Sequence, residues 1–304
     1  MMPDLANSPR FSSIARECAS LYTSGRILLD KDTLVIFTCG AEDNEGSARS
    51  RFLDYAKRCF KHGTFFRAED AFPVLLKSRR DDLLSIEHRL ADYSDCVLIL
   101  NESPGTLAEL GAFATNAKVV RKILLVNPRE HLGKSSFINL GPIAKVDKKS
   151  RFKKTIHVEM RTISIHFDTI LKRIEKHALR RRRLGVDFSQ PGIWDRIEGK
   201  LRLLFLQDII NLFCPVTHDE LLTTMKRLFP DQFVKFDIEL GLLTATKRVL
   251  EREQRLITST FSIDHNYNID KSLWFGLRKR VIDLYRSRDK SRLSLLHMRA
   301  GELL

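Results

Sequence analysis

One carboxylate, Glu109, stands where the sequence predicts a ligand pocket. It follows a short apolar run, Cys96–Leu100, then a Pro104-Gly105 turn, and a helical pattern that begins near Thr106. Such a run is typical of a strand buried on both faces, so the helix N-terminus is expected at the carboxyl end of a central strand. Ligands of open α/β sheets bind at that edge, and the free N–H groups of a helix N-terminus favour an anionic group such as phosphate.

A purely structural role for Glu109 is the alternative. A Glu in the first helical turn complements the helix dipole and can complete a capping box with Thr106 three residues earlier. Gly111 and Ala112 favour the pocket, because small residues permit close packing around the carboxylate and make a merely solvated helix face less plausible.

The elements expected to position this motif alternate along the chain. Strands are predicted at Thr33–Thr38, from Phe65 to the acidic Glu69-Asp70, at Cys96–Leu100 and at Lys122–Val126, with helices at Ala48–Lys61, Asp81–Tyr93 and Thr106–Val119. This alternation predicts an α/β fold with a doubly wound parallel sheet. The loop Ser135–Pro142 is expected near the rim of the same pocket.

Helices dominate after residue 193. Helices are predicted at Trp194–Phe213, Leu221–Leu228 and Phe236–Arg252, followed by a strand at Leu256–Ile263, a turn at Asp264–Asn268 and a return through Ile269–Phe275. Three helices and a hairpin are the order of a winged helix, which would place Lys247 and Arg248, with Thr244 and Thr246, on a recognition helix, and His265 and Asn266 at the wing tip. Winged helices also bind proteins, so phosphate contact or docking is preferred over base reading.

The net charge of +14 is concentrated in one segment. Between Lys145 and Arg183 the chain has 14 Lys and Arg residues against four Asp and Glu residues, a net of +10. A solvated helix face normally mixes both signs, so the block indicates a polyanionic partner, first of all nucleic acid, bound through phosphate neutralisation. A basic linker that only aids solubility is the other interpretation. The run that ends the block is expected to bind nucleic acid: Arg180, Arg181, Arg182 and Arg183.

Length and composition limit the remaining classes. The 304 residues suffice for two ordinary domains, and no apolar run approaches the roughly 20 residues of a membrane span. The five cysteines are scattered without C-x-x-C pairing, so neither a disulfide framework nor a metal site is expected. With no signal-peptide pattern at the N-terminus, a cytoplasmic protein is expected.

Several segments carry a family resemblance. Ser103–Ala112, preceded by Asp92–Leu100, resembles the signature of the nucleoside 2-deoxyribosyltransferase-like superfamily. Five segments together resemble, more closely, the effector toxins encoded beside bacterial retron reverse transcriptases: Phe37–Gly40, Glu69–Phe72, Leu84–Glu87, Glu102–Gly105 and Ser136–Pro142. This second resemblance covers nearly the whole chain.

The resemblance implies a reaction. The transferases use the Glu at the position of Glu109 as the nucleophile on the sugar C1′, so Glu109 is expected to attack C1′ of a nucleotide, or to stabilise an oxocarbenium-like centre there. Glu87 falls where they keep a second acid, and Glu102 is a third candidate catalytic carboxylate; helix-surface roles are the alternative for both. The residues expected to bind substrate are Cys39, Gly40, Asp70, Ser103, Gly105, Thr106 and Asn139.

One departure from the transferase pattern bears on the outcome of the reaction. The transferases usually carry Asp six residues before the nucleophile, where this chain has Ser103. The departure favours hydrolysis over base exchange. NAD+ or a related nucleotide is the expected substrate, and no cofactor is expected.

The resemblance also implies a domain organisation and partners. The expected parts are a helical extension at residues 1–30, a transferase-like catalytic domain at 31–160, a basic helix and linker at 161–192 and a winged-helix-like domain at 193–304. Such effectors resemble toxins restrained by the reverse transcriptase and its RNA–DNA product (msDNA), and related folds assemble as homo-oligomers. The competing hypothesis is a catalytically inactive nucleotide sensor that regulates DNA binding.

Overall fold

Two units make up the chain, residues 32–181 (the sheet unit) and residues 1–31 with 182–304 (the helical unit). The computed structural model describes residues 5–29, 34–41, 46–60, 63–75, 82–178, 184–232, 234–258 and 265–297. The segment expected as an N-terminal helical extension contains helix α1 (Pro9–Tyr22), which packs against α10 (His218–Leu228) and α12 (Lys271–Arg288) of the helical unit.

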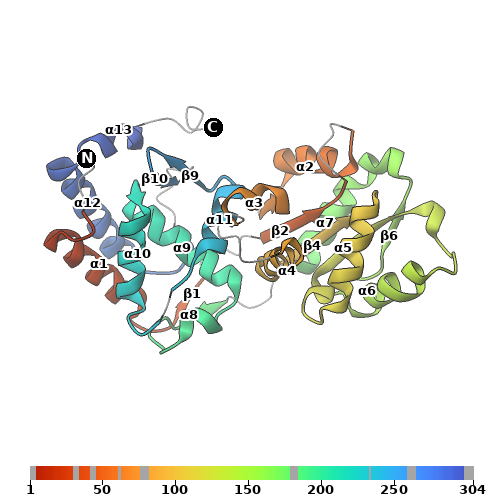
Figure 1. Cartoon of the computed structure of the whole chain (residues 1–304), viewed down its shortest axis with the longest axis horizontal. Helices are drawn as coiled ribbons and strands as arrows, with labels where there is room; N and C mark the ends of the chain where they lie inside the picture. The colour runs from red at the N-terminus through yellow and green to blue at the C-terminus, as the bar shows by residue number, and fades with distance from the viewer. Residues whose placement is uncertain are drawn as a thin grey trace. The chain divides into compact units, whose positions relative to one another are not determined.

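A parallel five-stranded sheet organises the sheet unit, in the order β3-β2-β4-β5-β6 (Figure 1). Its strands are β2 (Leu34–Cys39), β3 (Gly63–Phe66), β4 (Cys96–Leu100), β5 (Ile123–Pro128) and β6 (Ile156–Val158). The parallel α/β sheet predicted from the sequence is therefore confirmed, with β6 as a strand that the periodicity did not indicate. The chain leaves β2 toward β3 on one side and returns to β4 on the other, which makes the β2/β4 edge the switch point where such folds bind ligands.

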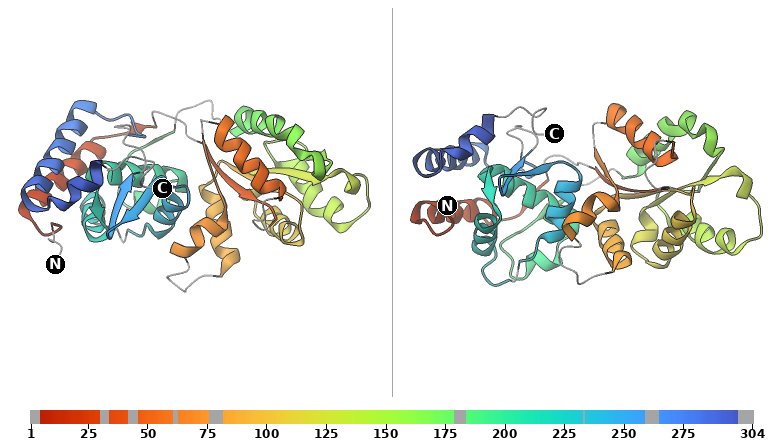
Figure 2. Two further views of the ribbon diagram at one scale, coloured as in Figure 1. Left: turned by 90° about the horizontal axis from the view of Figure 1, so that it is seen from above. Right: turned by 45° about the horizontal axis from the view of Figure 1, so that its top comes forward.

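Helices cover both faces of this sheet (Figure 2). Their bounds are α2 (Ala48–Cys59), α3 (Ala68–Leu75), α4 (Leu83–Tyr93), α5 (Pro104–Thr115), α6 (Ala144–Lys149) and α7 (Phe167–Ala178). On one face the side chains of Ile36 and Leu98 share a core with Phe52 of α2 and Ile170 of α7. On the other face Phe37 of β2 packs against Phe113 of α5, with the ring centroids 6.0 Å apart.

The described part of the basic block does not form one surface. Lys145, Lys148 and Lys149 lie on α6, whereas Lys172 and Arg173 lie on α7, which packs with α2 on the opposite face of the sheet. Since Phe167, Ile170 and Ile174 of α7 are core residues, this helix is an integral part of the sheet unit rather than a linker. The arginines at the end of the block lie outside the described residues: Arg180, Arg181, Arg182 and Arg183.

The helical unit combines helices with two small sheets. Its helices are α1, α8 (Ile193–Arg196), α9 (Gly199–Phe213), α10 (His218–Leu228), α11 (Asp237–Ala245), α12 (Lys271–Arg288) and α13 (Ser291–His297). Its strands are β1 (Ile27–Leu28), β7 (Gly185–Val186), β8 (Val216–Thr217), β9 (Val249–Arg252) and β10 (Arg255–Thr258), and β10 pairs antiparallel with both β8 and β9.

The hairpin lies earlier in the chain than predicted. The predicted helix Phe236–Arg252 ends at Ala245, and β9 and β10 turn at Glu253 and Gln254, whose φ angles of 49° and 59° place both in the left-handed region. The expected return strand is wrong, because residues 271–288 form α12. Trp274, Leu277 and Val281 are buried at helical spacing along α12, a periodicity that the short window Ile269–Phe275 concealed.

His265 and Asn266 are consequently not at a wing tip. His265 is buried, and the backbone N–H of Asn266 donates to Asp208 of α9, 2.7 Å away. Burial raises the pKa of Asp208 to about 7, although hydrogen bonds from Asn266 and Tyr267 oppose that shift. These two residues therefore connect a loop to the core of the helical unit.

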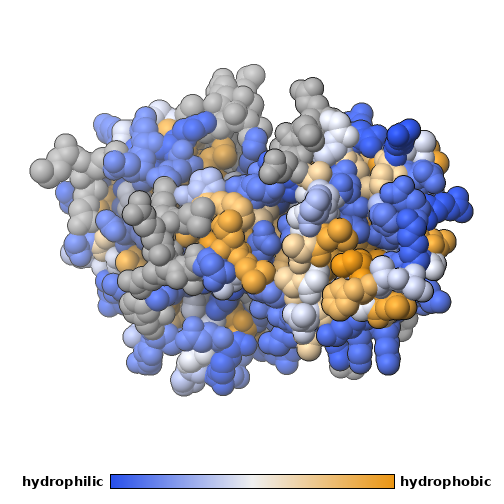
Figure 3. Space-filling view, turned by 45° about the vertical axis from the view of Figure 1, so that its right-hand side comes forward, coloured by the Kyte–Doolittle hydropathy of each residue, from blue (hydrophilic) through white to orange (hydrophobic). Residues whose placement is uncertain are grey.

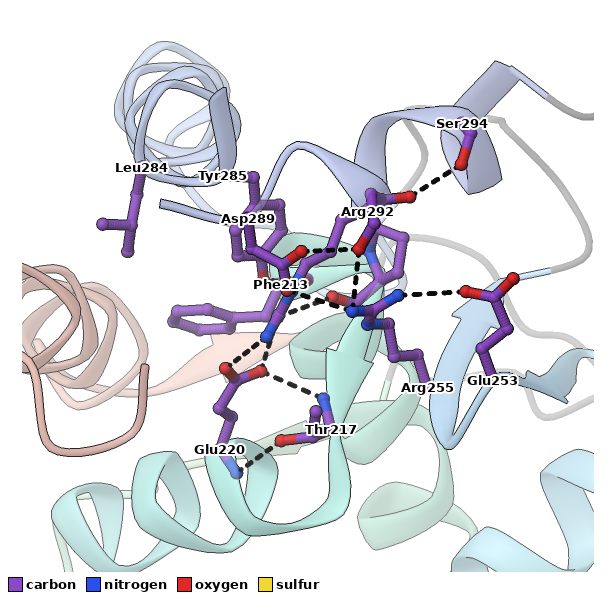
Figure 4. A network of polar contacts seen from close by, with 12 residues as sticks. Phe213, Thr217, Glu220, Glu253, Arg255, Leu284, Tyr285, Asp289, Arg292 and Ser294 are labelled. Atoms are coloured by element: carbon purple, nitrogen blue, oxygen red, sulfur yellow. Dashed lines mark hydrogen bonds and ion pairs between the residues drawn. The ribbon is translucent and has the colours of Figure 1, made fainter. Parts of the chain in front are cut away.

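A network of buried ion pairs joins α13 to α10 and β10 (Figure 4). The guanidinium of Arg292 is fully buried and donates to both carboxylate oxygens of Glu220, each at 2.7 Å, and to Asp289 at 2.8 Å. Asp289 also accepts from the buried Arg255 at 3.0 Å. Because each charge faces an opposite charge, removal of one partner leaves another buried and unpaired.

We expect Arg292→Ala to lower the free energy of unfolding of the helical unit by about 3–5 kcal/mol, because Glu220 stays buried without its partner. The matched control is Arg286→Ala, which removes an exposed pair with Asp283 and should cost under about 1 kcal/mol. Urea unfolding followed by tryptophan fluorescence measures both, and equal losses in the two variants would contradict this ranking.

Candidate active site

The turn after β4 starts α5 two residues earlier than predicted. Ser103 is the N-cap, its hydroxyl accepts from the Thr106 N–H at 3.3 Å, and the Thr106 hydroxyl accepts from the Ser103 N–H at 3.1 Å. The capping box therefore joins Ser103 to Thr106, and the alternative role for Glu109, in a box with Thr106, is not the one observed. Glu109 lies in the second turn of α5, beyond the first-turn position where a carboxylate best complements the helix dipole.

Glu109 lies among charged and polar side chains from four other elements. Cys39 ends β2, Glu87 lies on α4, Glu69 on α3 and Arg49 on α2. The Cys39 thiol is hydrogen-bonded to the Glu109 carboxylate, and the charges of Glu87, Glu69 and Arg49 all act on it. The structure thus brings together three of the residues predicted for the site, Cys39, Glu87 and Glu109.

Burial raises the pKa values in this cluster. Desolvation, with the negative charge of Glu87 next, raises the pKa of Glu109 to about 7, and desolvation with the charge of Glu69 raises the pKa of Glu87 to about 6. Burial raises the pKa of Cys39 well above its usual value, so the thiol stays protonated and donates to Glu109. Carboxyl groups that interact this closely titrate as a pair. Glu109 and Glu87 therefore gain or lose a proton near neutral pH, as groups in functional sites often do.

The Oε2 atom of Glu109 is buried and has no hydrogen-bond partner in the part of the chain that the structure describes. An unsatisfied buried carboxylate oxygen costs stability, and most buried polar atoms in folded proteins have a partner. The carboxylate interacts with Cys39, the last residue of β2, and so lies at the carboxyl end of that strand, beside the sheet's switch point. Its position and chemistry fit a group kept available for a ligand.

Glu102 occupies a different position from the one expected. Its carboxylate accepts backbone N–H bonds from Ala48 at 2.7 Å, Arg49 at 3.1 Å and Ala41 at 3.2 Å. Ala48 and Arg49 begin α2, so Glu102 supplies the anion at that helix N-terminus. The bonds hold the loop after β2 and the start of α2 against the turn after β4, which gives Glu102 a positioning role.

Gly40 is held by close packing. A Cβ atom at Gly40 would lie 2.5 Å from the Cβ of Arg49, so a side chain at this position would displace Arg49. The buried guanidinium of Arg49 in turn pairs with Glu69 at 2.8 Å. Gly40 therefore permits the close approach of Arg49, whose cation lies beside the carboxylates of Glu109, Glu87 and Glu69. We call these three carboxylates, with Cys39 and Arg49, the carboxylate cluster.

The other predicted substrate-binding residues have structural partners. Asp70 pairs with Arg67, with 2.9 Å between its Oδ2 and the arginine Nε. The Asn139 amide donates to the carbonyls of His131 and Lys134, each at 2.7 Å. Thr106 is buried and donates to Asn101 at 3.2 Å, and Gly105 has room for a Cβ, since Ser103 Oγ at 3.7 Å would be its nearest neighbour.

A cleft of about 600 Å³ lies at the carboxyl ends of β4, β5 and β6. Glu102 and Ser103 line it, together with Arg129, His131 and Arg161, whereas Glu109 and Glu87 do not. The structure therefore separates Ser103 from the carboxylate cluster and places it on the wall of this cleft.

The segment that Asn139 holds carries apolar surface. Phe137 is 82% exposed and Leu140 is 72% exposed. A space-filling view shows apolar side chains gathered in patches on the face turned forward (Figure 3). Asn139 thus positions an exposed segment.

The predicted nucleic-acid contacts differ in availability. Lys247 is exposed just after α11, with a left-handed φ of 54°. Arg248 donates to Gln207 at 2.8 Å, and desolvation lowers its pKa to about 10. Its guanidinium is therefore engaged within the helical unit and is less available to nucleic acid than the ammonium of Lys247. For four of the predicted contacts, which are not among the described residues, nucleic-acid binding stays a prediction: Arg180, Arg181, Arg182 and Arg183.

Arg49 and Glu69 were missed as members of the cluster. Glu69 stood in a segment that carried the family resemblance, but no spacing joined it to residue 109. Nothing in the local sequence distinguishes Arg49 from the neighbouring Arg51, and only the fold places it against Gly40.

In the part of the chain that the structure describes, no helix is long and apolar enough to cross a membrane.

A family model for the STM3845 retron effector protein matches residues 45–256. The proposed ribosyltransferase/DNA-binding protein of Escherichia coli retron Ec73 is 35% identical over 122 residues, 38% of this chain and 39% of that protein. Its counterpart from E. coli retron Ec86 is 35% identical over 117 residues, 38% of each chain. The chain thus spans about two fifths of the length of these curated relatives.

We expect Glu109→Gln to stabilise the sheet unit at pH 8. Because the pKa of Glu109 is about 7 in the folded state against 4.5 as its ordinary value, the folded chain binds more protons between these values, and the free energy of unfolding falls as pH rises. The amide removes this penalty, a gain of roughly 1–3 kcal/mol at pH 8 that vanishes near pH 4.5.

The matched control is Glu102→Gln, which should destabilise the unit at pH 8 because its carboxylate accepts three backbone N–H bonds. Chemical denaturation at both pH values distinguishes the variants. A Glu109→Gln protein less stable than the wild type at pH 8 would show that burial of this carboxylate is not costly.

Proposed function

The chain belongs to the STM3845 retron effector family, and we propose that it acts as the toxin of a bacterial anti-phage retron by cleaving the N-glycosidic bond of NAD+ or a related nucleotide. The observation that carries this proposal is the buried Oε2 of Glu109 without a partner among the described residues, at the switch point of a parallel sheet. The relatives named as proposed ribosyltransferases support chemistry at a ribose carbon.

The proposed reaction begins at the C1′ carbon of the ribose. The carboxylate of Glu109 attacks C1′, or stabilises an oxocarbenium-like centre there, as the bond from C1′ to the ring nitrogen of nicotinamide breaks. The bonding electrons pass to that nitrogen, and nicotinamide leaves as a neutral molecule. Water then adds to C1′, releases Glu109 and loses a proton, which gives ADP-ribose.

The charge of the cluster favours a cationic leaving group. Of the described residues, Glu109, Glu87 and Glu69 face one buried cation, Arg49, so the ionised cluster is net negative. A negative site attracts the positively charged nicotinamide ring and stabilises the positive charge that develops on the ribose. Because nicotinamide needs no proton to leave, the reaction does not depend on a protonated Glu87, whose proposed role is to position a ribose hydroxyl or the leaving base.

Cys39 assists Glu109 in this proposal, and Ser103, on the wall of the separate cleft, bears on the outcome of the reaction. The thiol of Cys39 donates to Glu109 and orients its carboxylate. Ser103, where the transferases carry Asp, caps α5 through Thr106. Because Ser103 supplies no carboxylate where the transferases carry Asp, the proposed outcome is hydrolysis rather than base exchange.

The proposed partners are the retron reverse transcriptase and its msDNA, which restrain the toxin. The order α10, α11, β9, β10, with β8 paired to β10, supports a winged-helix-like module in the helical unit that contacts nucleic acid or protein. Assembly into a homo-oligomer or a higher assembly remains a prediction.

A catalytically inactive nucleotide sensor that regulates DNA binding is the second candidate. The names of both relatives include DNA binding, which is the observation that keeps this candidate. Under it, Glu109 would bind a ligand without turnover.

Mass spectrometry of nucleotides in cells that express the protein alone should show depletion of NAD+ and release of nicotinamide. Glu109→Gln should abolish both, because an amide is a poor nucleophile and carries no charge to stabilise the ribosyl cation. The matched control is Glu175→Gln, on α7 across the sheet, which should behave as the wild type. Equal nucleotide pools in the wild type and Glu109→Gln would favour the sensor.

The pH profile tests the coupling between Glu87 and Glu109. Since Glu109 must be ionised to react, kcat/KM for NAD+ should rise with pH through about 7. Glu87→Gln removes a negative charge that raises the pKa of Glu109, so the rising limb should move down by roughly half a unit to one unit. A limb that stays in place or moves to higher pH would contradict the proposed contact.

A further inference from the structure

The solvent face of α12 carries cations interleaved with an aromatic ring. Trp274, Leu277, Val281, Leu284 and Tyr285 bury the inner face of the helix. On the other side Lys271, Phe275 and Lys279 follow one another at four-residue steps, and Arg286 follows one heptad later, so the four lie on one stripe. We call these four residues the α12 stripe.

The cations of the α12 stripe are available. Lys271 and Lys279 are exposed and make no ion pair with any residue that the structure describes. Arg286 is 66% exposed and pairs with Asp283, at 3.2 Å, in a surface contact worth little. Arg288 and the following Lys290 extend the positive charge beyond the stripe.

The surface on which a winged helix usually reads DNA carries mixed charge here. The charged residues of α11 are Asp237 and Glu239, both acidic, and Glu239 is engaged with Arg202 at 2.9 Å. The tip of the β9–β10 hairpin exposes Glu251 and Glu253 beside Arg252. With Lys247 exposed just after α11, the charges at this surface are of both signs, so it offers phosphate no concentrated positive charge.

The α12 stripe and α11 lie on different sides of the helical unit. Both helices pack on α9, and the views in Figures 1 and 2 place α12 beside α1 and away from α11. Only the end of α12 reaches the hairpin among the described residues, where Asp289 accepts from Arg255 of β10. A nucleic acid bound along α12 would therefore leave α11 uncovered.

We infer that the helical unit binds single-stranded nucleic acid along the α12 stripe, with the phosphate backbone on Lys271, Lys279 and Arg286 and a base stacked on Phe275. The inference rests on one part of the proposed function, that the helical unit contacts nucleic acid, and does not depend on the glycosidase activity. Phe275 is 44% exposed although it is a large aromatic residue, and its ring lies edge-on to Trp274 with centroids 5.6 Å apart.

Phe275 determines the choice between single and double strands. Cations that neutralise phosphates bind both forms, whereas an exposed ring between them offers a stacking surface to an unpaired base. The bases of a duplex are already stacked on one another, so the ring contributes little to duplex binding. An unpaired stretch is therefore the form that uses all four side chains.

The test measures fluorescence anisotropy of the full chain with a labelled single-stranded DNA of about 20 nucleotides, longer than one typical binding site, and with the corresponding duplex. The triple variant Lys271→Ala, Lys279→Ala, Arg286→Ala should bind the single strand about tenfold or more weakly, and the slope of log K against log salt should fall by about 2, since each lost phosphate contact contributes about 0.7. Phe275→Ala should weaken single-strand binding about tenfold and leave duplex binding within about twofold.

The matched control replaces three exposed cations elsewhere in the helical unit, Arg196→Ala, Lys226→Ala and Arg227→Ala, and should stay within about threefold of the wild type. Circular dichroism checks that each variant is folded, and NAD+ turnover should be unchanged in all of them. The inference is wrong if the wild type binds single strands and the control variant loses this binding while the α12 variant keeps it. In that case nucleic acid is still a partner, but it binds at another surface.

A wild type that prefers the duplex, with Phe275→Ala unchanged, would also overturn the inference. A wild type that binds neither probe would remove nucleic acid as a direct partner. Neither result affects the glycosidase proposal, which is measured separately through turnover.

Discussion

Desolvation of the Glu109 carboxylate is the constraint on which the arrangement of the sheet unit depends. A carboxylate in this position is held near other negative charges and away from water, and both effects raise its pKa to about 7. Such a group persists only where the surrounding structure is rigid. That rigidity comes from a sheet whose strands β2 and β4 are fully buried, and from the three N–H bonds by which Glu102 joins the ends of these strands.

The helical unit handles buried charge in the opposite way. Arg292, Glu220, Asp289 and Arg255 are each buried beside an opposite charge, whereas the nearest charges to Glu109 include two other carboxylates. The contrast separates charges that fix a structure from a carboxylate that is kept available. The exposed cations of the α12 stripe form a third class, since they face solvent and suit a polyanionic partner.

The sequence predicted the parallel sheet, because continuous apolar runs such as Cys96–Leu100 occur in strands buried on both faces. The same pattern placed Glu109 at a pocket, whereas Glu87 and Cys39 were expected from the family resemblance. The sequence did not separate Glu102 from Glu109, since the partners of Glu102 are backbone groups about 53 to 61 residues away. It also misplaced the hairpin, whose strands are four residues each, and a net of +10 along the chain did not show that α6 and α7 cover opposite faces of the sheet.

The central claim is that hydrolysis of NAD+ depends on the ionised carboxylate of Glu109. It is tested most directly by following nicotinamide release with NMR, using the purified chain and NAD+ at pH 8, beside Glu109→Gln. The account predicts release by the wild type, with a loss of about a thousandfold or more in the variant, whose fold and NAD+ binding are retained. Release by Glu109→Gln at a rate near that of the wild type would contradict it.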